Sequence, residues 1–154
     1  MTDRYSPVQS RADNDSTDFI IRSGPALYIA DATYLEDGGR SIDLASRTLM
    51  AKRASSQKWR SFVNEAATNG EAIPAGIYVG PTIPAADIAA GDVKNLEILL
   101  FGAWFDASRL IIENAKTLET VIGTGTIHAK TVRDYLFYRA LIPLGTSTSS
   151  GGEN

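Results

Sequence analysis

The chain contains no cysteine and only one histidine, His128. Without cysteine there are no disulfide bonds and no thiolate chemistry, so extra stability has to come from packing or from assembly. Zinc sites favour histidine and cysteine ligands, and this chain would have to build such a site mostly from carboxylates. A nucleophilic triad normally uses histidine as its base, but little around His128 is suited to pair with it. We therefore interpret His128 as a surface or structural residue.

Long apolar segments are also missing. No uninterrupted apolar run approaches the roughly 20 residues of a membrane-spanning helix. Residues 1–20 include Asp3, Asp13, Asp15 and Asp18, and they lack the basic start and the apolar run of a secretion signal. We expect a soluble protein that has no membrane partner and is not exported through such a signal.

Charge of neither sign is in large excess. The 15 basic and 18 acidic residues give a net charge of -3, which provides no general attraction to nucleic acid or to an anionic membrane. Locally, six basic residues and one acidic residue lie between Arg40 and Arg60, whereas eight acidic and three basic residues lie from Ser61 to Glu119. Segments of opposite charge can attract each other within one fold or between copies. The basic segment includes Trp59, but a solvated strand face or half of a protein interface explains it better than nucleic-acid contact.

The strongest local pattern is a short apolar run at residues 73–80, IPAGIYVG. Its residues are mostly β-branched or aromatic, and proline and glycine stand at both ends, which predicts a core strand between turns. Asn69-Gly70, just before it, predicts a turn. Further strands are predicted at residues 48–52, 59–63 and 96–105, and the length and aromatic content of the last place it at the centre of the sheet.

Helical patterns are fewer. Thr131 has the character of a helix N-cap, and Val132, Leu136, Phe137 and Ala140 follow at helical spacing on one face. Residues 81–91 are predicted to form either a loop or one short helix. Residues 109–122 fit a helix beginning near Arg109 and fit a strand equally well, and both alternatives stay open.

The domain organisation follows from these patterns, and a chain of 154 residues suits one domain with a sizeable core. We expect a flexible polar arm at residues 1–18, a single β-rich domain at 19–144 and a flexible Gly/Ser/Thr-rich tail at 145–154. The apolar triplet Phe19, Ile20 and Ile21 either starts the domain or forms a strand that docks elsewhere. The predicted fold class is α+β, mostly β, with one or two short helices.

No catalytic pattern stands out. Glu65 with Glu71, or Asp87 with Asp92, would offer the paired carboxylates of a glycosidase, but 18 acidic residues make such pairs inevitable. Residues 123–126, GTGT, lack the lysine of a phosphate-binding loop. We predict a protein that is not an enzyme and needs neither cofactor nor metal. Its large aromatic residues are more typical of a core than of a ligand platform: Trp59, Phe62, Phe101, Trp104 and Phe105.

Several short motifs occur in an order that is similar to the head decoration proteins of lambda-type phages, a capsid-stabilising family. The resemblance rests on Leu49-Met50-Ala51-Lys52, Lys58-Trp59, the run Ile73-Pro74-Ala75-Gly76-Ile77-Tyr78-Val79, the alanines Ala85, Ala86, Ala89 and Ala90, and the run Leu96-Glu97-Ile98-Leu99-Leu100-Phe101-Gly102-Ala103-Trp104-Phe105. The late helix followed by an apolar strand also resembles the end of that family. Residues 26–43 and 110–130 are additional here, so the trimer contacts of the family are not carried over.

The resemblance implies a homotrimer, made in the host cytoplasm, that sits on the outer surface of the capsid in the virion. It implies the major capsid protein as partner and an N-terminal arm that adds a strand to it, with Tyr5, Val8, Phe19, Ile20 and Ile21 as capsid-binding residues. The alternative is a virion-surface recognition module that binds glycan through exposed aromatic residues such as Trp59 or Trp104. A hydrolase that uses acidic residues is the third hypothesis.

Overall fold

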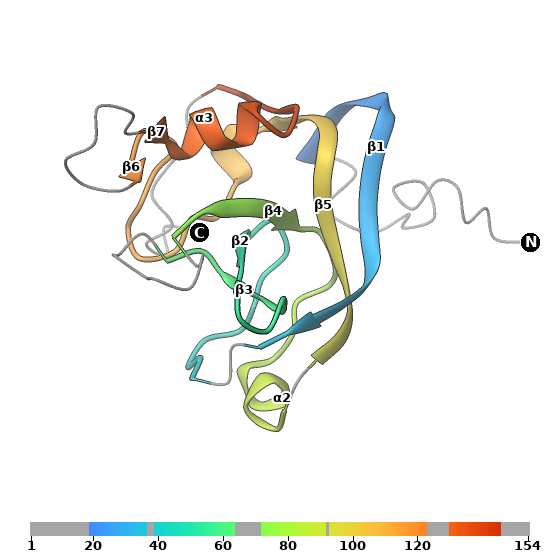
Figure 1. Ribbon diagram of the computed structural model, residues 1–154, viewed down its shortest axis with the longest axis vertical. Coiled ribbons are helices and arrows are strands. Elements are labelled where there is room, and N and C mark those ends of the chain that lie inside the picture. The colour runs from blue at the N-terminus through green and yellow to red at the C-terminus, as the bar shows by residue number, and fades with distance from the viewer. Residues whose placement is uncertain (1–18, 37–38, 64–71, 92, 123–129, 146–154) are drawn as a thin grey trace, which may run out of the picture.

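The computed structural model describes residues 19–36, 39–63, 72–91, 93–122 and 130–145, and for residues 21–34 it describes the backbone (Figure 1). The predicted arm at 1–18, the Asn69-Gly70 turn, residues 123–126 and the tail after Gly145 lie outside these ranges. The main sheet contains β1 (Ile20–Leu35), β2 (Leu49–Lys52), β3 (Trp59–Ser61), β4 (Pro74–Tyr78), β5 (Val93–Asp106) and β8 (Leu141–Leu144).

The remaining elements are short. A two-stranded sheet pairs β6 (Val121–Ile122) with β7 (Lys130–Thr131), and the helices are α2 (Ala85–Ala89), α3 (Val132–Phe137) and the 3-10 turn η1 (Ala107–Arg109). The predicted α+β class, mostly β with short helices, is confirmed. At residues 81–91 the short-helix alternative is the one observed, as α2.

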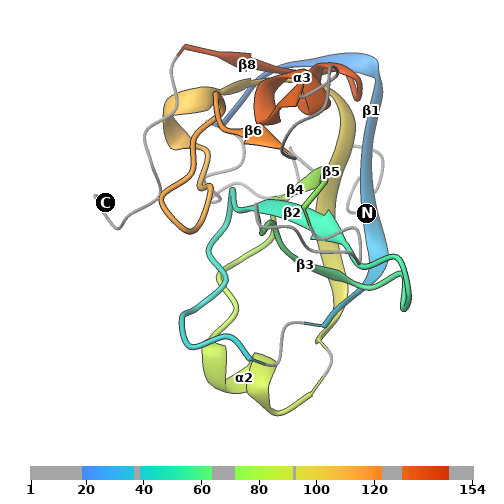
Figure 2. The ribbon, with the colours of Figure 1, turned by 60° about the vertical axis from the view of Figure 1, so that its left-hand side comes forward.

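The strands of the main sheet pair in a closed ring. β5 pairs with β4, β4 with β2 and β2 with β3, all antiparallel, and β5 also pairs with β1 along most of its length. A parallel bridge between Leu35 and Trp59 joins β1 to β3 and completes the ring. β8 lies outside the ring, parallel to β5. Figures 1 and 2 show β1 and β5 side by side along the long axis, with α3 near one end and α2 at the other.

Two apolar cores lie on opposite faces of the central strands. Leu49 and Ile77 belong to the core that α3 covers, whereas Met50 and Tyr78 belong to the core that α2 covers. All five residues of β4 are buried, as expected for a strand that is covered on both faces. This arrangement explains why the predicted strand at residues 73–80 is apolar without alternation, and it confirms that prediction.

Gly76 allows β4 and β5 to approach closely. A Cβ atom at this position would lie 2.6 Å from Ile98 Cγ2 and 3.0 Å from the carbonyl oxygen of Leu99. The glycine in the PAG motif is therefore a packing requirement of the sheet.

The α3 helix begins as predicted but ends early. Thr131 Oγ1 accepts a hydrogen bond from Asp134 N at 3.2 Å, and Asp134 Oδ2 accepts one from Thr131 N at 2.9 Å, which forms a capping box. Val132 and Leu136 are buried as expected. The prediction that Phe137 and Ala140 face the core is wrong, because the helix ends at Phe137 and Ala140 turns the chain with a φ of 52°.

Residues 109–122 form neither a helix nor a strand along their length: Arg109 ends η1, and Val121–Ile122 form β6. Asp106 Oδ1 accepts from Ser108 N at 2.9 Å and so caps η1, after which Ile111 makes an isolated parallel bridge with Thr48. Leu110, Ile112 and Leu118 are buried in the core beneath α3. The apolar residues of this segment therefore fill the core from an irregular backbone.

Candidate functional site

The structure places the predicted arm contacts in different environments. Phe19 is fully buried and Ile20 is nearly so, and the Phe19 ring lies 5.0 Å from that of Phe105 between centroids. Assigning these two residues to the capsid protein is therefore wrong for this conformation, because they complete the core of their own chain. Tyr5 and Val8 lie outside the described residues, and Ile21 is described only as backbone of β1.

The candidate catalytic residues are not brought together where the structure describes them. Asp87 is exposed on α2, whereas Glu65, Glu71, Asp92 and His128 lie outside the described residues. Within the described ranges, no group of three or more histidine, aspartate or glutamate side chains is placed to hold a metal ion. No helix of the described part is long and apolar enough to cross a membrane.

Two pKa shifts have structural causes. Hydrogen bonds from the Thr131 backbone and side chain hold the pKa of the Asp134 carboxyl below its usual value. Burial lowers the pKa of the Arg139 guanidinium. The first shift belongs to a helix cap, and the second marks a cation that is partly removed from water.

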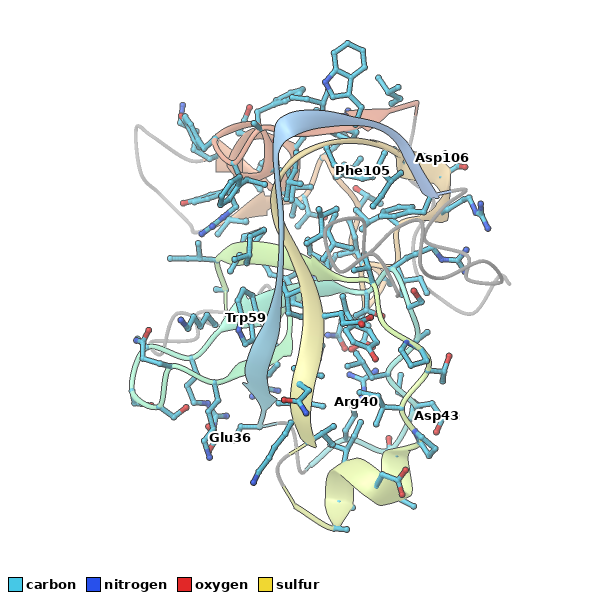
Figure 3. All side chains as sticks on the ribbon, turned by 90° about the vertical axis from the view of Figure 1, so that its right-hand side faces the viewer. Glu36, Arg40, Asp43, Trp59, Phe105 and Asp106 are labelled. Carbon is cyan, nitrogen blue, oxygen red and sulfur yellow. The ribbon has the colours of Figure 1, made fainter. Side chains whose placement is uncertain are left out.

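A buried ion pair links the two charged segments within one chain. Arg40 Nη1 donates to Glu113 Oε2 at 3.0 Å, and Arg40 Nη2 also contacts Glu113 Oε1. Their side chains are only 4% and 14% exposed. Arg40 Nη2 further donates to the carbonyl oxygen of Asp43, whose carboxylate accepts from Ala85 N at 2.8 Å at the start of α2. Figure 3 shows Arg40 and Asp43 toward the α2 end, so this network stabilises the fold there.

The five large aromatic residues divide into two groups. Trp59, Phe62 and Phe105 are buried, as predicted for a core. Phe101 and Trp104 are 40% and 43% exposed, so the core prediction is wrong for these two residues. Burial also excludes Trp59 as a glycan platform, because only 4% of it reaches solvent. Of the two tryptophans, Trp104 is the exposed one.

Two further aromatic residues are exposed, one at the end of α3 and one just after it. Phe137 is 44% exposed and Tyr138 is 70% exposed. The carbonyl oxygen of Ala140, which ends the α3 turn, accepts from Gly102 N and Ala103 N at 3.2 Å each, between Phe101 and Trp104 in the sequence. Two N–H groups on one acceptor interrupt the alternation of β5, and Gly102 has a φ of 84° there.

Sequence patterns do not separate these exposed aromatic residues from the core. Phe101, Trp104 and Phe105 lie within one apolar run, and only the bulge at Gly102 and the turn at Ala140 decide which rings face water. The one available signal is Tyr138, which stands outside the apolar face of the predicted helix.

Comparison with known proteins returned no match to this chain among family models, curated proteins or solved structures. Its function therefore has to be argued from its own residues and fold.

Proposed function

We propose that the chain is a non-enzymatic decoration protein that binds the outside of a phage head and stabilises the expanded shell. The main support is that the motifs of the family resemblance occupy three adjacent strands. Leu49 of β2 pairs with Ile77 of β4, and Ile77 pairs with Leu99 of β5. Motifs that are 20 or more residues apart in sequence thus form one continuous part of the sheet.

The fold suits a protein that acts by binding. A ring of strands with cores on both faces gives a rigid body, and rigid surfaces lose little conformational entropy when they bind. The proposed partners are the major capsid protein and other copies of the chain in a homotrimer. Because many copies bind one shell and each bridges several subunits, modest contacts combine into a large stabilisation.

The proposed capsid contacts are fewer than the sequence suggested. Phe19 and Ile20 belong to the core, so the arm that adds a strand to the capsid protein is confined to residues 1–18, with Tyr5 and Val8 as its apolar contacts. The domain begins beside Phe105, because Ile20 pairs with that residue.

Two truncations test the arm. Removal of residues 1–18 should leave the unfolding temperature nearly unchanged and should abolish co-sedimentation with expanded heads, because only the arm is lost. Removal of residues 1–21 should also destabilise the domain, because it deletes Phe19 from the core. Undiminished binding of the shorter truncation would rule out the arm mechanism.

The glycan-binding alternative is favoured by one observation, the 43% exposure of Trp104. Exposed indole rings stack on sugar rings, and the buried Trp59 provides an internal reference for fluorescence. A saturable emission shift during a glycan titration, absent in Trp104→Leu, would support recognition. No shift in the wild-type chain would favour the decoration function.

A further inference from the structure

The straight part of β1, residues 26–34, has an edge that no other described strand occupies. On one side these residues pair with β5. On the other side β1 meets β3 only at the bridge between Leu35 and Trp59, which comes directly after them, and Pro25 comes directly before them. Figures 1 and 2 show this part of β1 at the margin of the molecule, with β5 on its inner side. Within the described part of the chain, the outer edge is an open row of backbone groups.

This edge of β1 lacks the devices that keep edge strands from pairing. The sequence of residues 26–34 is ALYIADATY, which has Asp31 as its one charge and contains neither lysine nor proline. Isoleucine, threonine and tyrosine in it favour extended pairing. The open edge at β8 is different, because that strand has only four residues and one of them is Pro143. A long edge without charge or proline to protect it favours pairing with a further strand.

The strand that best matches this edge is the same strand of a second copy. A partner has to be extended, of similar length, and open along one side. Among the described strands of the main sheet, only β1 and β8 are open along one side for most of their length, and β8 is short and contains Pro143. Two copies of β1 can pair antiparallel about a two-fold axis, so that every contact between them is made twice.

The sequence of residues 26–34 suits this pairing. Full overlap of two antiparallel copies places Ala30 opposite itself and each tyrosine opposite an alanine: Tyr28 opposite Ala32, and Tyr34 opposite Ala26. Asp31 then lies opposite Ile29, so like charges are not directly opposed. The register shift between Ala30 and Thr33 increases the local twist of β1. A twisted edge suits one twisted partner better than an extended stack of strands.

We infer that the outer edge of residues 26–34 is the interface of a two-fold dimer, in which β1 of one copy pairs antiparallel with β1 of another. The pairing would continue the sheet from β4 and β5 of one copy, through both β1 strands, to β5 and β4 of the other. This inference goes beyond the proposed function and does not depend on it. The contact is compatible with the proposed homotrimer, because it can join copies that belong to neighbouring trimers.

Cysteine crosslinking tests the pairing directly, because the chain has no cysteine of its own. Residue 30 lies on the two-fold axis of the fully overlapped pair, so Ala30→Cys should form a covalent dimer with a short bismaleimide. Ala26→Cys is the matched control, because its two copies would lie about 26 Å apart along the strand, out of reach of the reagent. A mixture of Ala26→Cys and Tyr34→Cys should crosslink again, since these positions lie opposite each other.

A backbone variant tests the hydrogen bonds of the edge. Ala30 pairs with Ile98 and Thr33 with Leu96, so residue 32 has no partner of its own in β5. Ala32→Pro removes an N–H from β1 and should leave those pairs intact. It should halve the mass of the assembly in sedimentation equilibrium, whereas Ala32→Ser, which keeps the N–H, should leave the mass unchanged. Thermal unfolding verifies that each variant folds, and if Ala32→Pro does not, the cysteine pattern decides alone.

Other results overturn the inference in recognisable ways. A monomer, or crosslinking of Ala26→Cys as readily as of Ala30→Cys, excludes the two-fold pairing. A trimer without crosslinking at residue 30 means that the copies meet through another surface, and the proposed function stands. If Ala32→Pro keeps its mass but loses co-sedimentation with expanded heads, a strand of the capsid protein occupies the edge. If the cysteine pattern is as expected and the wild type does not bind heads, the proposed function fails and the inference stands.

Discussion

At the scale of single residues, the fold depends on a few positions where a different side chain would disturb the surrounding atoms. Gly76 and the Arg40–Glu113 pair are the clearest, because each lies where separate segments meet in the interior. Neither is revealed by hydropathy alone. Gly76 is noticeable in sequence as a glycine inside a strand, whereas Arg40 and Glu113 are two of many charged residues.

Gly76→Ala should destabilise the protein by roughly 1–3 kcal/mol, the usual cost of an extra methyl group in a packed core. The new Cβ meets Ile98 Cγ2 at 2.6 Å and a backbone oxygen at 3.0 Å. Urea unfolding measures the effect. Because Ile98→Ala removes the nearer atom, the double variant should lose less stability than the sum of the single changes. Gly39→Ala is the control, since a Cβ at Gly39 would have nothing within 4 Å, and an equal loss there would contradict this explanation.

Glu113→Ala should cost about 3–5 kcal/mol, because it removes the carboxylate from a guanidinium that stays buried. Replacing both partners in Arg40→Met/Glu113→Leu should recover much of that loss, since the apolar pair needs no counter-charge. Chemical denaturation of Arg40→Met, Glu113→Leu and the double variant gives the coupling energy. Additive losses would show that the pair contributes nothing beyond the separate side chains.

At the scale of elements, local signals predict some segments well. β4 and β5 are recognisable as apolar runs with glycine or proline near them. The α3 helix begins at a capping box that is visible in the sequence. β1 is different, because the sequence suggests two apolar runs, separated by Gly24-Pro25. The structure carries one strand through both runs, with a register shift between Ser23 and Tyr28 that accommodates the break. Pairing with β5 along the length of β1 overrides the local signal for a break. A short sequence window does not contain this long-range pairing.

The candidate site shows the same limit. The triplet that starts at Phe19 has the composition of a docking strand and equally that of a core strand, and only the proximity of Phe105 decides between them. Likewise, the exposure of Trp104 depends on where the turn after α3 meets β5.

The α3 cap should make stability depend on pH. The folded-state pKa of Asp134 is lowered, so its contribution is fully present above the unfolded-state pKa and is lost as pH falls through the folded-state value. Asp134→Ala removes this carboxylate and should lower stability at neutral pH. Urea midpoints between pH 7 and acid pH should therefore converge for the wild type and Asp134→Ala as the carboxylate is protonated. A constant difference at all pH values would contradict this role of Asp134.

At the scale of the whole molecule, the main sheet has open edges along β1 and β8. β1 meets β3 only through the bridge between Leu35 and Trp59, so most of β1 pairs with β5 alone, and among the described residues β8 likewise pairs with β5 alone. An open edge invites pairing with other chains. Pro143 lies in β8 and has no N–H to donate.

Pro143→Val should promote association between molecules. The carbonyl of Ala140 points to β5, so alternation along β8 turns the backbone nitrogens of Leu141 and Pro143 to the outer edge. Valine restores a donor there and leaves an apolar residue of similar size in the buried position, so the folded chain should keep its unfolding temperature within a few degrees. Sedimentation velocity over a concentration series should then show larger species than for the wild type, whereas Pro81→Val, outside the strands, should behave as the wild type does. An unchanged size distribution for Pro143→Val would mean that the outer edge of β8 is already protected by something other than the proline.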